Sequence, residues 1–478
     1  MRKPLPPLLA LLALLVSGCM VGPDYVRPPL DAPAGWRLSE QDASDLANTA
    51  WWEQFGDPVL NDLVITALRE NKDLMIAAAR VEQFAGNYGF VRSALFPQLS
   101  VSADARRQRD SSAFAVGGDE TYSSYNAVLN ASWEIDIWGR IRRQTEAARA
   151  QLLASEEGRR GVILSLVGSV AGAYINLRDL DRQLEIARAT AKSRGESYEL
   201  FKLRFEGGVI SVLELSQNRS QYEEALATIP PLEKAIAQQE NGLSVLLGRN
   251  PGPIPRGQDI DHLTLPAIPA GLPSELLERR PDLRRAEQNL IAANALIGAA
   301  KAAYFPTISL TGLFGYASSS LGDLFEGQSK VWSYGAPISL PIFTAGAIAG
   351  QVQAAEAAQQ QALLAYQKAI QEAFREVNDS LINQNRTREQ LKAQRRQVEA
   401  LQQYAATARL RYDNGYTSYI EVLDAERSLF NVQLQYTQTQ QAEFQAMIDL
   451  YLAMGGGWVS EAEKVTDAVA RTDPSVGQ

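Results

Sequence analysis

The sequence has 478 residues, 46 of them Lys or Arg and 55 Asp or Glu, so its formal net charge is −9. With 46% hydrophobic and 21% charged residues, the composition is that of a folded protein. One Cys and one His exclude an intramolecular disulfide and a Cys/His zinc cluster, and the single histidine, His262, leaves little room for a nucleophile–histidine site. The acidic balance argues against a nucleic-acid partner, whose phosphates are bound by Lys and Arg.

The first 18 residues are predicted to be a lipoprotein signal peptide. Arg2 and Lys3 precede an apolar run, residues 8–16, that is too short to cross a bilayer as a helix. Small residues before Cys19 favour cleavage there and lipidation of Cys19 with palmitate or a similar acyl chain, the alternative being a chance cysteine in an apolar run. Met20 replaces the Asp that signals inner-membrane retention, which favours an outer-membrane lipoprotein.

The rest of the chain is a tandem repeat. Five residues recur 209 positions later: Asp73, Gly89, Phe96, Pro97 and Ser100. Eight recur 207 positions later: Gly139, Ala147, Ala148, Arg204, Gly208, Ser211, Glu214 and Gly248. The change in offset indicates a variable loop in each half, at about 107–122 and 317–330. We expect these parts: an N-terminal tail, 19–57; a first repeat, 58–248; a linker, 249–275; a second repeat, 276–455; and a C-terminal tail, 456–478.

Very long helices are predicted within each repeat. Between Pro97 and Pro230, and between Pro341 and Pro474, the chain has no proline and is rich in good helix formers. A helix over about 139–205 would be roughly 100 Å long. The tips Glu206-Gly207-Gly208 and Asp413-Asn414-Gly415 then turn the chain, and return helices run to Gly248 and Gly455. Coiled-coil spacing supports this reading at Ile370, Phe374, Val377 and Leu381.

Before each long helix, apolar residues alternate with polar ones, which predicts a β-hairpin over 97–137 and another over 305–342. The apolar positions are Leu99, Val101, Ala103, Ala105, Ala127, Leu129, Ala131, Trp133 and Ile135 in the first hairpin, and Ile308, Leu310, Phe314, Tyr316, Trp332, Tyr334, Ala336, Ile338 and Leu340 in the second. Alternation of this kind fits transmembrane barrel strands. A small soluble sheet half-buried against a helix remains the alternative, and Pro337 counts mildly against a closed barrel.

Four strands cannot close a barrel, and a bilayer does not tolerate open sheet edges. Three copies would supply twelve strands, enough to leave a passage, and twelve helices to continue it. The expected fold is therefore mainly α with membrane β: a homotrimer with a 12-stranded β-barrel continuous with a 12-helix periplasmic α-barrel, each chain with an internal two-fold repeat. A rival reading makes residues 161–177 a short transmembrane helix. Its repeat partner, 368–384, carries five charged residues, which argues against that reading.

Several motifs resemble the lipoprotein branch of the TolC-like outer-membrane factors, which serve resistance–nodulation–division (RND) efflux pumps. They are Cys19-Met20-Val21-Gly22-Pro23-Asp24-Tyr25 with Arg27-Pro28, Ile229 to Glu233, Leu276 to Leu283, Ala303 to Pro306 and Ile308 to Gly312. The resemblance implies a trimeric exit duct in the outer membrane that extends into the periplasm, and an equatorial layer built from the linker and both tails. It also implies an RND pump and a periplasmic membrane-fusion adaptor as partners. Exported substrates are not implied.

The resemblance also implies a gate at the periplasmic tip. Glu421 and Asp424 lie on one helix face and match acidic residues that line the closed mouth, while Ile420 matches an apolar residue that narrows it. A clasp would include Tyr412 and Glu214. Some family members have an arginine where this chain has Thr417, so we expect Arg427, three residues after Asp424, to replace that latch. Without the resemblance, Glu421 and Asp424 would be a solvated acidic face balanced by Arg427.

Two Gly-x-x-Ser tips match the region where adaptor hairpins dock. They are Gly208 to Ser211 and Gly415 to Ser418, and simple turn and capping chemistry explains them equally well. With three copies, six carboxylates would crowd the mouth and favour cations. We therefore expect a narrow, cation-preferring resting state.

Two other classes of function are the alternatives. A periplasmic structural lipoprotein with coiled-coil hairpins and no pore is the main alternative. An enzyme with Glu421 and Asp424 as paired carboxylates lacks an apolar pocket to raise one carboxyl pKa. The Gly252–Gly257 segment is followed by Gln258, where a phosphate-binding loop needs Lys. No catalytic activity, cofactor or metal site is expected.

Overall fold

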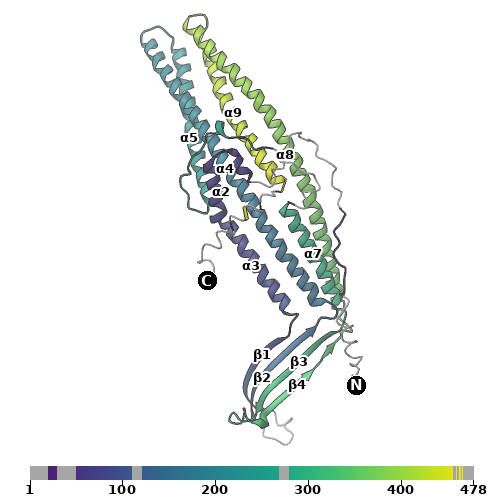
Figure 1. The fold of residues 1–478 in the computed structure, drawn as a ribbon. Coiled ribbons are helices and arrows are strands. Elements are labelled where there is room, and N and C mark those ends of the chain that lie inside the picture. The colour runs from purple at the N-terminus through teal and green to yellow at the C-terminus, as the bar shows by residue number, and fades with distance from the viewer. Residues whose placement is uncertain are drawn as a thin grey trace. The chain divides into compact units, whose positions relative to one another are not determined.

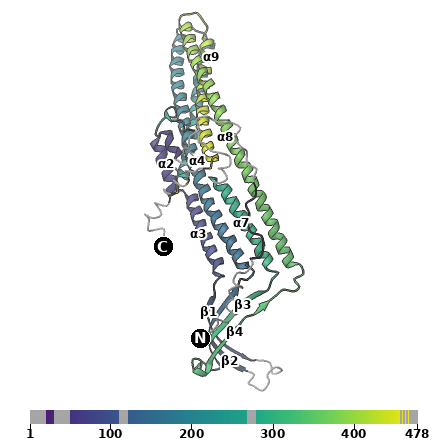
Figure 2. The same cartoon turned by 45° about the vertical axis from the view of Figure 1, so that its right-hand side comes forward.

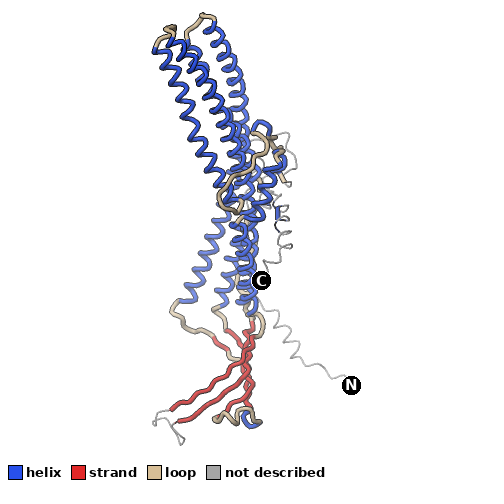
Figure 3. The backbone as a smooth tube through the Cα atoms, turned by 90° about the vertical axis from the view of Figure 1, so that its left-hand side faces the viewer, coloured by secondary structure: helices blue, strands red, loops and turns tan. Residues whose placement is uncertain are grey.

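The structure is a computed structural model that describes residues 20–29, 50–109, 121–267 and 279–455, together with 459, 462, 463 and 466. The described part is mostly helical, with one antiparallel sheet (Figures 1 and 3). Two compact units can be distinguished. Unit 1 consists of Met1–Pro29, Arg80–Glu156 and Arg285–Gln367, and unit 2 of Leu30–Ala79, Glu157–Arg284 and Lys368–Gln478. Each unit thus contains parts of both sequence repeats.

Unit 1 contains the sheet. Its strands are β1 (Gln98–Arg109), β2 (Thr121–Ile135), β3 (Thr307–Ser318), β4 (Lys330–Gly335) and the short β5 (Ile338–Ser339). The order is β1-β2-β3-β4, with β5 also pairing with β3, and all pairs are antiparallel. The two predicted hairpins are therefore present and are joined through β2 and β3. In one chain, β1 and β4 remain at the two edges of this sheet (Figure 1).

The predicted alternation of side chains is confirmed by the strand register. Val101 lies opposite Leu129, Leu129 opposite Phe314, and Phe314 opposite Trp332, so the apolar positions of the predicted alternation share one face, while Val128, Leu313 and Val331 lie on the other. That face is exposed: Val101 is 78% and Tyr334 83% accessible. A soluble sheet half-buried against a helix would have hidden these side chains.

Pro337 separates β4 from β5 but does not damage the outer edge of the sheet. The Ser309 amide donates a hydrogen bond to the Pro337 carbonyl over 3.1 Å. In an antiparallel pair, the return bond would come from residue 337 to residue 309, and proline has no N–H to make it. The missing donor therefore faces β3 and not the edge. Pro337 therefore costs one hydrogen bond to β3 but leaves the outer edge able to pair, so it does not prevent the closure of a barrel.

The long helices are present in both repeats. Helix α4 (Arg140–Glu206) and helix α8 (Ala347–Asp413) have 67 residues each, and their return helices α5 (Val212–Leu246) and α9 (Tyr419–Ala453) have 35 each. Shorter helices are α2 (Pro58–Glu70), α3 (Lys72–Ser93) and α7 (Pro281–Ala302), with 3-10 turns at Trp51–Phe55, Ile260–His262 and Gly327–Ser329. Within unit 1, segments of α3, α4, α7 and α8 lie side by side in that order (Figure 2).

An extended N-terminal strap, residues 20–29, is held against unit 1. The buried Arg143 side chain donates to the Asp24 carboxylate (2.7 Å) and to the Gly22 carbonyl (3.3 Å). Gly22 contacts Gly298 so closely that a Cβ atom on Gly22 would lie 2.3 Å from the Gly298 Cα atom. Further along, Arg27 forms an ion pair with Glu287 at 2.7 Å. The N-terminal motif around Gly22, Asp24 and Arg27 therefore fastens this strap to the helices of its own chain.

The main apolar core lies in unit 2, where Trp51 stacks on Tyr451 with ring centroids 5.2 Å apart. Among the described helices, α4 is long and apolar enough to cross a membrane by length and composition. Its apolar residues between 163 and 177 are instead part of this core, with Val170 and Tyr174 fully buried. The reading of residues 161–177 as a transmembrane helix is therefore not supported.

Candidate functional site at the tips of the helical hairpins

Both tips of unit 2 turn by the same backbone chemistry. Gly208 has φ = 71° and Gly415 has φ = 78°, the left-handed conformation that glycine adopts at low cost. The amides of Gly208 and Val209 return to carbonyls of the last turn of α4 at 2.9 Å each, which is the Schellman pattern. Gly415 and Tyr416 do the same at the end of α8. The two glycines thus end the long helices at repeat-related positions.

The serines that follow behave differently. Ser211 forms a full capping box with Glu214: the Ser211 hydroxyl accepts from the Glu214 amide (3.3 Å), and the Glu214 carboxylate accepts from the Ser211 amide (2.8 Å). Ser418 occupies the same N-cap position of α9 but makes no side-chain capping bond. Capping chemistry therefore explains Ser211 and leaves Ser418 without a capping role.

A tip cluster of Phe201, Tyr412 and Tyr419 holds the two hairpins together. Phe201 and Tyr419 are buried, with ring centroids 4.2 Å apart, and Tyr412 lies 5.0 Å from Tyr419. The Asn218 side chain donates to the Tyr419 hydroxyl over 2.7 Å. Burial raises the pKa of Tyr419, so this phenol remains protonated at neutral pH. The cluster joins α4 and α5 of the first hairpin to α8 and α9 of the second.

The acidic residues of the predicted gate lie beside this cluster. Asp424 pairs with Arg427 at 3.0 Å, as their spacing predicts, and both side chains are about half exposed. Glu421 lies 4.0 Å from Arg411, at the limit of an ion pair. Exposed pairs of this kind contribute about 0–1 kcal/mol each. Ile420 is 57% exposed, so an apolar side chain stands in solvent next to the two acids.

The predicted clasp residues have other partners within one chain. The Tyr412 hydroxyl accepts from Arg204 at 3.5 Å, and the Glu214 carboxylate is engaged in its capping box. Among the described residues, no hydrogen bond joins Tyr412 to Glu214. Arg204 was not expected at the site, although it is the repeat partner of Arg411, which approaches Glu421 in the other hairpin. The repeat was the signal that could have found it.

Next to the tip cluster, sequence reasoning missed a groove of about 430 Å³ lined by α4, α8 and α9. Arg194, Arg409 and Glu426 are its charged residues. Burial raises the pKa of Glu426 and lowers that of Arg194, whose guanidinium lies 5.2 Å from the centre of the Phe430 ring. Glu426 lies 3.9 Å from Arg409. No spacing in the sequence brings α4 and α9 together, because 232 positions separate Arg194 from Glu426.

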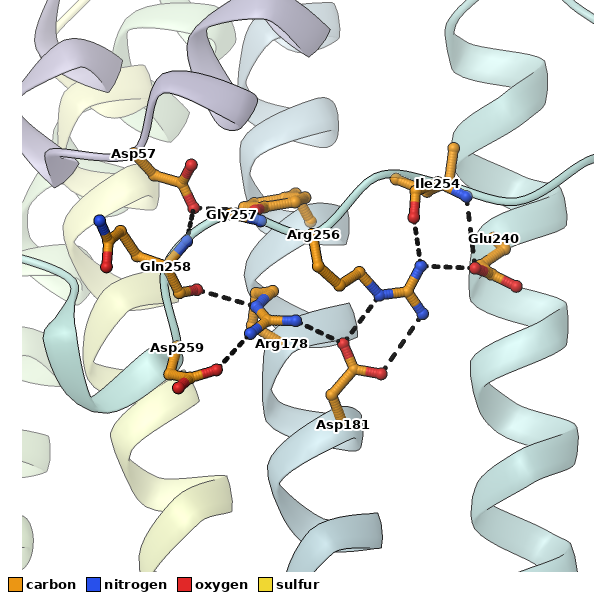
Figure 4. Close-up of polar contacts among 10 residues, drawn as sticks. Asp57, Arg178, Asp181, Glu240, Ile254, Arg256, Gly257, Gln258 and Asp259 are labelled. Carbon is orange, nitrogen blue, oxygen red and sulfur yellow. Dashed lines mark hydrogen bonds and ion pairs between the residues drawn. The ribbon is translucent and has the colours of Figure 1, made fainter.

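At the other end of the hairpins, Asp57 organises a buried polar network (Figure 4). One carboxylate oxygen of Asp57 caps α2 by accepting from the Val59 amide (2.8 Å). The other accepts from the Tyr174 hydroxyl (2.8 Å) and from the Gln258 amide (2.9 Å). A Cβ atom on Gly257 would collide with the Asp57 carboxylate. The Gly252–Gly257 segment is therefore closed around an internal carboxylate and offers no room for a phosphate.

Arginines extend this network across α4 and α5. Figure 4 shows Arg256 of the linker reaching Asp181 on α4 and Glu240 on α5, and Arg178 reaching Asp181 and Asp259. Linker and helices are thus joined by charge-assisted bonds from both sides. None of these residues was predicted as a site from the sequence.

Next to Arg178 on α4, Asp179 is a buried carboxyl group. It is 5% exposed and accepts a hydrogen bond from the Gln183 side chain at 2.7 Å. Burial raises the pKa of Asp179 to about 6. Among the described residues, no three His, Cys, Asp or Glu side chains come close enough to hold a metal ion. The predicted lipidation site, Cys19, lies outside the described residues.

Comparison with known proteins identifies the family. The outer membrane efflux protein family matches residues 63–249 and 272–456, that is, once in each repeat. The toluene efflux pump outer membrane protein TtgF of Pseudomonas putida is 39% identical over 460 residues, which cover 94% of this chain and 96% of that protein. The cation efflux system protein CusC of Escherichia coli O6:H1 is 38% identical over 452 residues, 93% of this chain and 97% of that protein.

Solved structures agree with these relatives. The CmeC outer membrane channel of Campylobacter jejuni superimposes with a TM-score of 0.89 at 26% identity, covering 96% of this chain and all of that one. The open state of the MtrE outer membrane channel of Neisseria gonorrhoeae gives 0.84 at 33% identity, covering 92% and 99%. These relatives are named as efflux proteins or as outer membrane channels, and not as enzymes. The fold, outer-membrane location and exit-duct function expected from the sequence are confirmed, and the chain belongs to the outer membrane efflux protein family.

Proposed function

We propose that three copies of this chain form the outer-membrane duct of a tripartite efflux system and conduct small molecules such as drugs passively from periplasm to exterior. The observation that carries the proposal is the sheet of unit 1, which has an exposed apolar face and two edge strands. Exposed apolar side chains on alternate positions suit lipid, and a bilayer requires every strand edge to be paired. Neighbouring copies can satisfy both needs by closing a 12-stranded barrel.

The gate is part of this proposal. Three copies of Glu421 and Asp424 would line the mouth, with Ile420 as its narrowest apolar point. Two charges about 4 Å apart interact by roughly 1 kcal/mol in water and about 4 kcal/mol at an effective dielectric of 20. Arg427 and Arg411 lie close enough to offset part of that repulsion. Because these pairs are weak, a partner can displace them at low cost.

The remaining roles follow from the same assembly. The tips at Gly208, Ser211, Gly415 and Ser418 receive the hairpin of a periplasmic membrane-fusion adaptor, which links the duct to an inner-membrane RND pump. Cys19 carries the acyl chains that tether each copy to the outer membrane. The pump supplies the energy, so the duct has no catalytic residues, cofactor or nucleic-acid partner of its own.

Single-channel conductance in planar bilayers tests the duct and the gate together. The wild type is expected to give a small, cation-preferring conductance. Asp424→Ala is expected to give a larger conductance, because the pair with Arg427 is lost, and a weaker cation preference, because the mouth loses three carboxylates. Asp379→Ala, an exposed acid on α8, serves as the matched control and should behave as the wild type. An unchanged conductance in Asp424→Ala would reject the gate while leaving the duct intact.

The alternative, a periplasmic structural lipoprotein without a pore, is not supported, because the apolar face of the sheet is exposed and the similar solved structures are outer membrane channels. It predicts a protein that is water-soluble and monomeric once the lipid is removed, and bilayers that remain silent. Purification without Cys19 lipidation, in the presence and absence of detergent, separates the two. A heat-sensitive trimer that needs detergent supports the duct.

A further inference from the structure

The two hairpins of unit 1 each carry one cation at equivalent positions. In the first hairpin Arg107 lies opposite Ser123, and in the second Lys330 lies opposite Tyr316. Adding the repeat offsets, 209 and 207, to Arg107 and Ser123 gives Tyr316 and Lys330, so the two pairs are counterparts in the repeat. Arg107 and Lys330 therefore lie at the same level of their hairpins, although they stand on different strands of the pair.

Both cations lie on the face of the sheet that carries the predicted apolar positions. The ladder between β1 and β2 is continuous, so Arg107 shares the face of Val101. Lys330 comes two residues before Trp332 on β4 and shares its face in the same way, since side chains two apart on a strand point to the same side. Both cationic side chains are exposed. The proposed lipid-facing surface thus includes two charged residues.

No acid accompanies these cations on the same face of the described strands. The acids of β1 to β5 are Asp104 and Glu134, and both occupy the alternate positions that point to the other face. Within the described ranges, neither Arg107 nor Lys330 forms an ion pair with a carboxylate. The positive charge of this surface is therefore available to an external anion.

The two cations belong to the end of the sheet that lies away from the helices. Strand β1 follows α3 and β2 precedes α4, so Gln98 and Ile135 are near the helices and Arg109 and Thr121 are far from them (Figure 1). Because the helices extend into the periplasm, the far end of the sheet faces the exterior in the proposed duct. Arg107 and Lys330 therefore belong to its outer rim.

The arginines near the helix end of β2 are paired, in contrast to the cations of the outer rim. Arg140 pairs with Glu134 at 2.6 Å, and Arg142 pairs with Asp136 at 3.3 Å. The two ends of the sheet thus differ in charge: arginines near the helix end are neutralised by neighbouring acids, and the outer rim is cationic.

The length of the apolar face places the rim in a head-group layer. Outward positions of β2 from Ile135 to Tyr125 span ten residues, roughly 33 Å along the strand or about 25 Å at the tilt of a barrel strand. That is the height of the apolar band of a membrane barrel. Ser123, the next outward position, lies opposite Arg107. Arg107 therefore stands just beyond the hydrocarbon layer.

The loop between β3 and β4 adds an apolar ring next to the second cation. The Ser329 hydroxyl donates to the Asp323 carbonyl over 2.7 Å, which folds the loop back on itself. Phe325 meets the ring of Tyr316 edge-on, with centroids 5.5 Å apart, and is 72% exposed. Since Tyr316 lies opposite Lys330, a cation and an exposed aromatic ring share one corner of the rim. This combination suits a ligand with an anionic head group and apolar chains.

We propose that Arg107 and Lys330 bind the phosphate groups of the glycolipid that forms the outer leaflet of the outer membrane, the lipid A part of lipopolysaccharide. Arginine binds phosphate oxygens in pairs, and lysine acts as a point charge on a long apolar stem. Acyl chains of the same lipid would then lie on the apolar face below. The inference rests on the proposed trimeric duct, which would present three copies of each cation around its rim.

Binding of lipid A to the full-length trimer in detergent tests the site. A ligand that binds the folded state raises the unfolding temperature, so thermal unfolding at increasing concentrations of bisphosphorylated lipid A gives an apparent affinity. Arg107→Gln and Lys330→Gln are each expected to weaken it about fivefold, and the double variant roughly 20-fold. Without lipid, all variants should unfold at the wild-type temperature. Arg106→Gln is the matched control, because it removes the same charge from the other face and should bind as the wild type does.

Several outcomes would overturn the lipid site. Equal weakening by Arg106→Gln and Arg107→Gln would mean that binding follows net charge and not the outward face. Inorganic phosphate that stabilises the protein at the same concentration as lipid A would identify a free-phosphate site. If lipid A does not stabilise a wild-type protein that conducts in planar bilayers, the inference is wrong and the duct stands. If the wild type neither forms a trimer nor conducts, the proposed function fails and the lipid site fails with it.

Discussion

The two ends of the hairpins in unit 2 are held together by different means. At the linker end, Trp51 and Tyr451 belong to a large apolar core, and Asp57 sits in a network of buried hydrogen bonds. At the tips, the small cluster of Phe201, Tyr412 and Tyr419 stands beside half-exposed ion pairs. Stability in a folded protein is not uniform, and regions with few buried contacts open first. The linker end therefore fixes the helices, and the tips are the part that can rearrange.

Removing the centre of the linker network should have the largest effect. Asp57→Ala leaves the Tyr174 hydroxyl and the Gln258 amide without their buried acceptor, and α2 loses its cap. We expect the free energy of unfolding to fall by about 3–5 kcal/mol. Urea denaturation followed by circular dichroism, at fixed protein concentration, measures it. Asp62→Ala on the exposed side of α2 is the control, and a similar loss there would show that the effect does not come from the network around Asp57.

The stability of the folded chain should also depend on pH, through the buried carboxyl group of Asp179 on α4. Its pKa is raised from 3.8 to about 6 in the folded chain, so the folded state binds this proton more tightly than the unfolded state does. The contribution of protonated Asp179 to the free energy of unfolding is fully present below about pH 4 and is lost as pH rises through 6. The difference is on the order of 3 kcal/mol. Asp179→Asn should therefore be more stable than the wild type at pH 7.5 and similar to it at pH 4.

Denaturation at several pH values checks this expectation. Asp179→Glu retains a carboxyl group at the site and should retain the pH dependence. A wild-type protein whose stability does not change between pH 4 and 7 would contradict the burial argument for Asp179.

A smaller effect is expected at the tip cluster. Tyr419→Phe keeps the ring contact with Phe201 but removes the acceptor of the Asn218 amide group. The expected loss is about 1–2 kcal/mol, confined to the tips. Hydrogen exchange at the ends of α4 and α8 should accelerate while the helices near the linker keep their protection. Faster exchange at the linker end would mean that the two regions are one cooperative unit.

The smallest effect distinguishes the two tips from each other. Ser211→Ala breaks a complete capping box and should cost about 1 kcal/mol locally, whereas Ser418→Ala removes no capping bond and should cost almost nothing. Thermal unfolding and hydrogen exchange of the two variants, side by side, provide the measurement. Equal losses would indicate that Ser418 acts through a partner and not through its own helix.

Most of the fold could be predicted because its signals are local. Proline-free stretches predicted α4 and α8, glycines predicted the tips, and alternation predicted the face on which Val101 and Trp332 lie. Because the sequence is a tandem repeat, each element predicted in one half could be checked against its counterpart in the other. The β2–β3 junction and the role of Pro337 required the register, which depends on contacts between residues far apart in sequence.

The candidate site could be predicted only in part. The Asp424–Arg427 pair followed from helix spacing, while the partner of Tyr412 did not. Asp57, Tyr174 and Gln258 meet across separations of 117 and 201 positions, so no local pattern marks them. Buried polar groups find their partners through tertiary packing, and a single sequence does not record which ones.

Pro230 and Pro231 give the two return helices different mechanical properties. Helix α5 continues through both prolines, so two carbonyls of its preceding turn receive no hydrogen bond from these positions. Helix α9 has no proline and is an unbroken rod from the gate acids to Ala453. A force applied at the tips should therefore bend α5 near its two prolines, whereas α9 should transmit it to its other end.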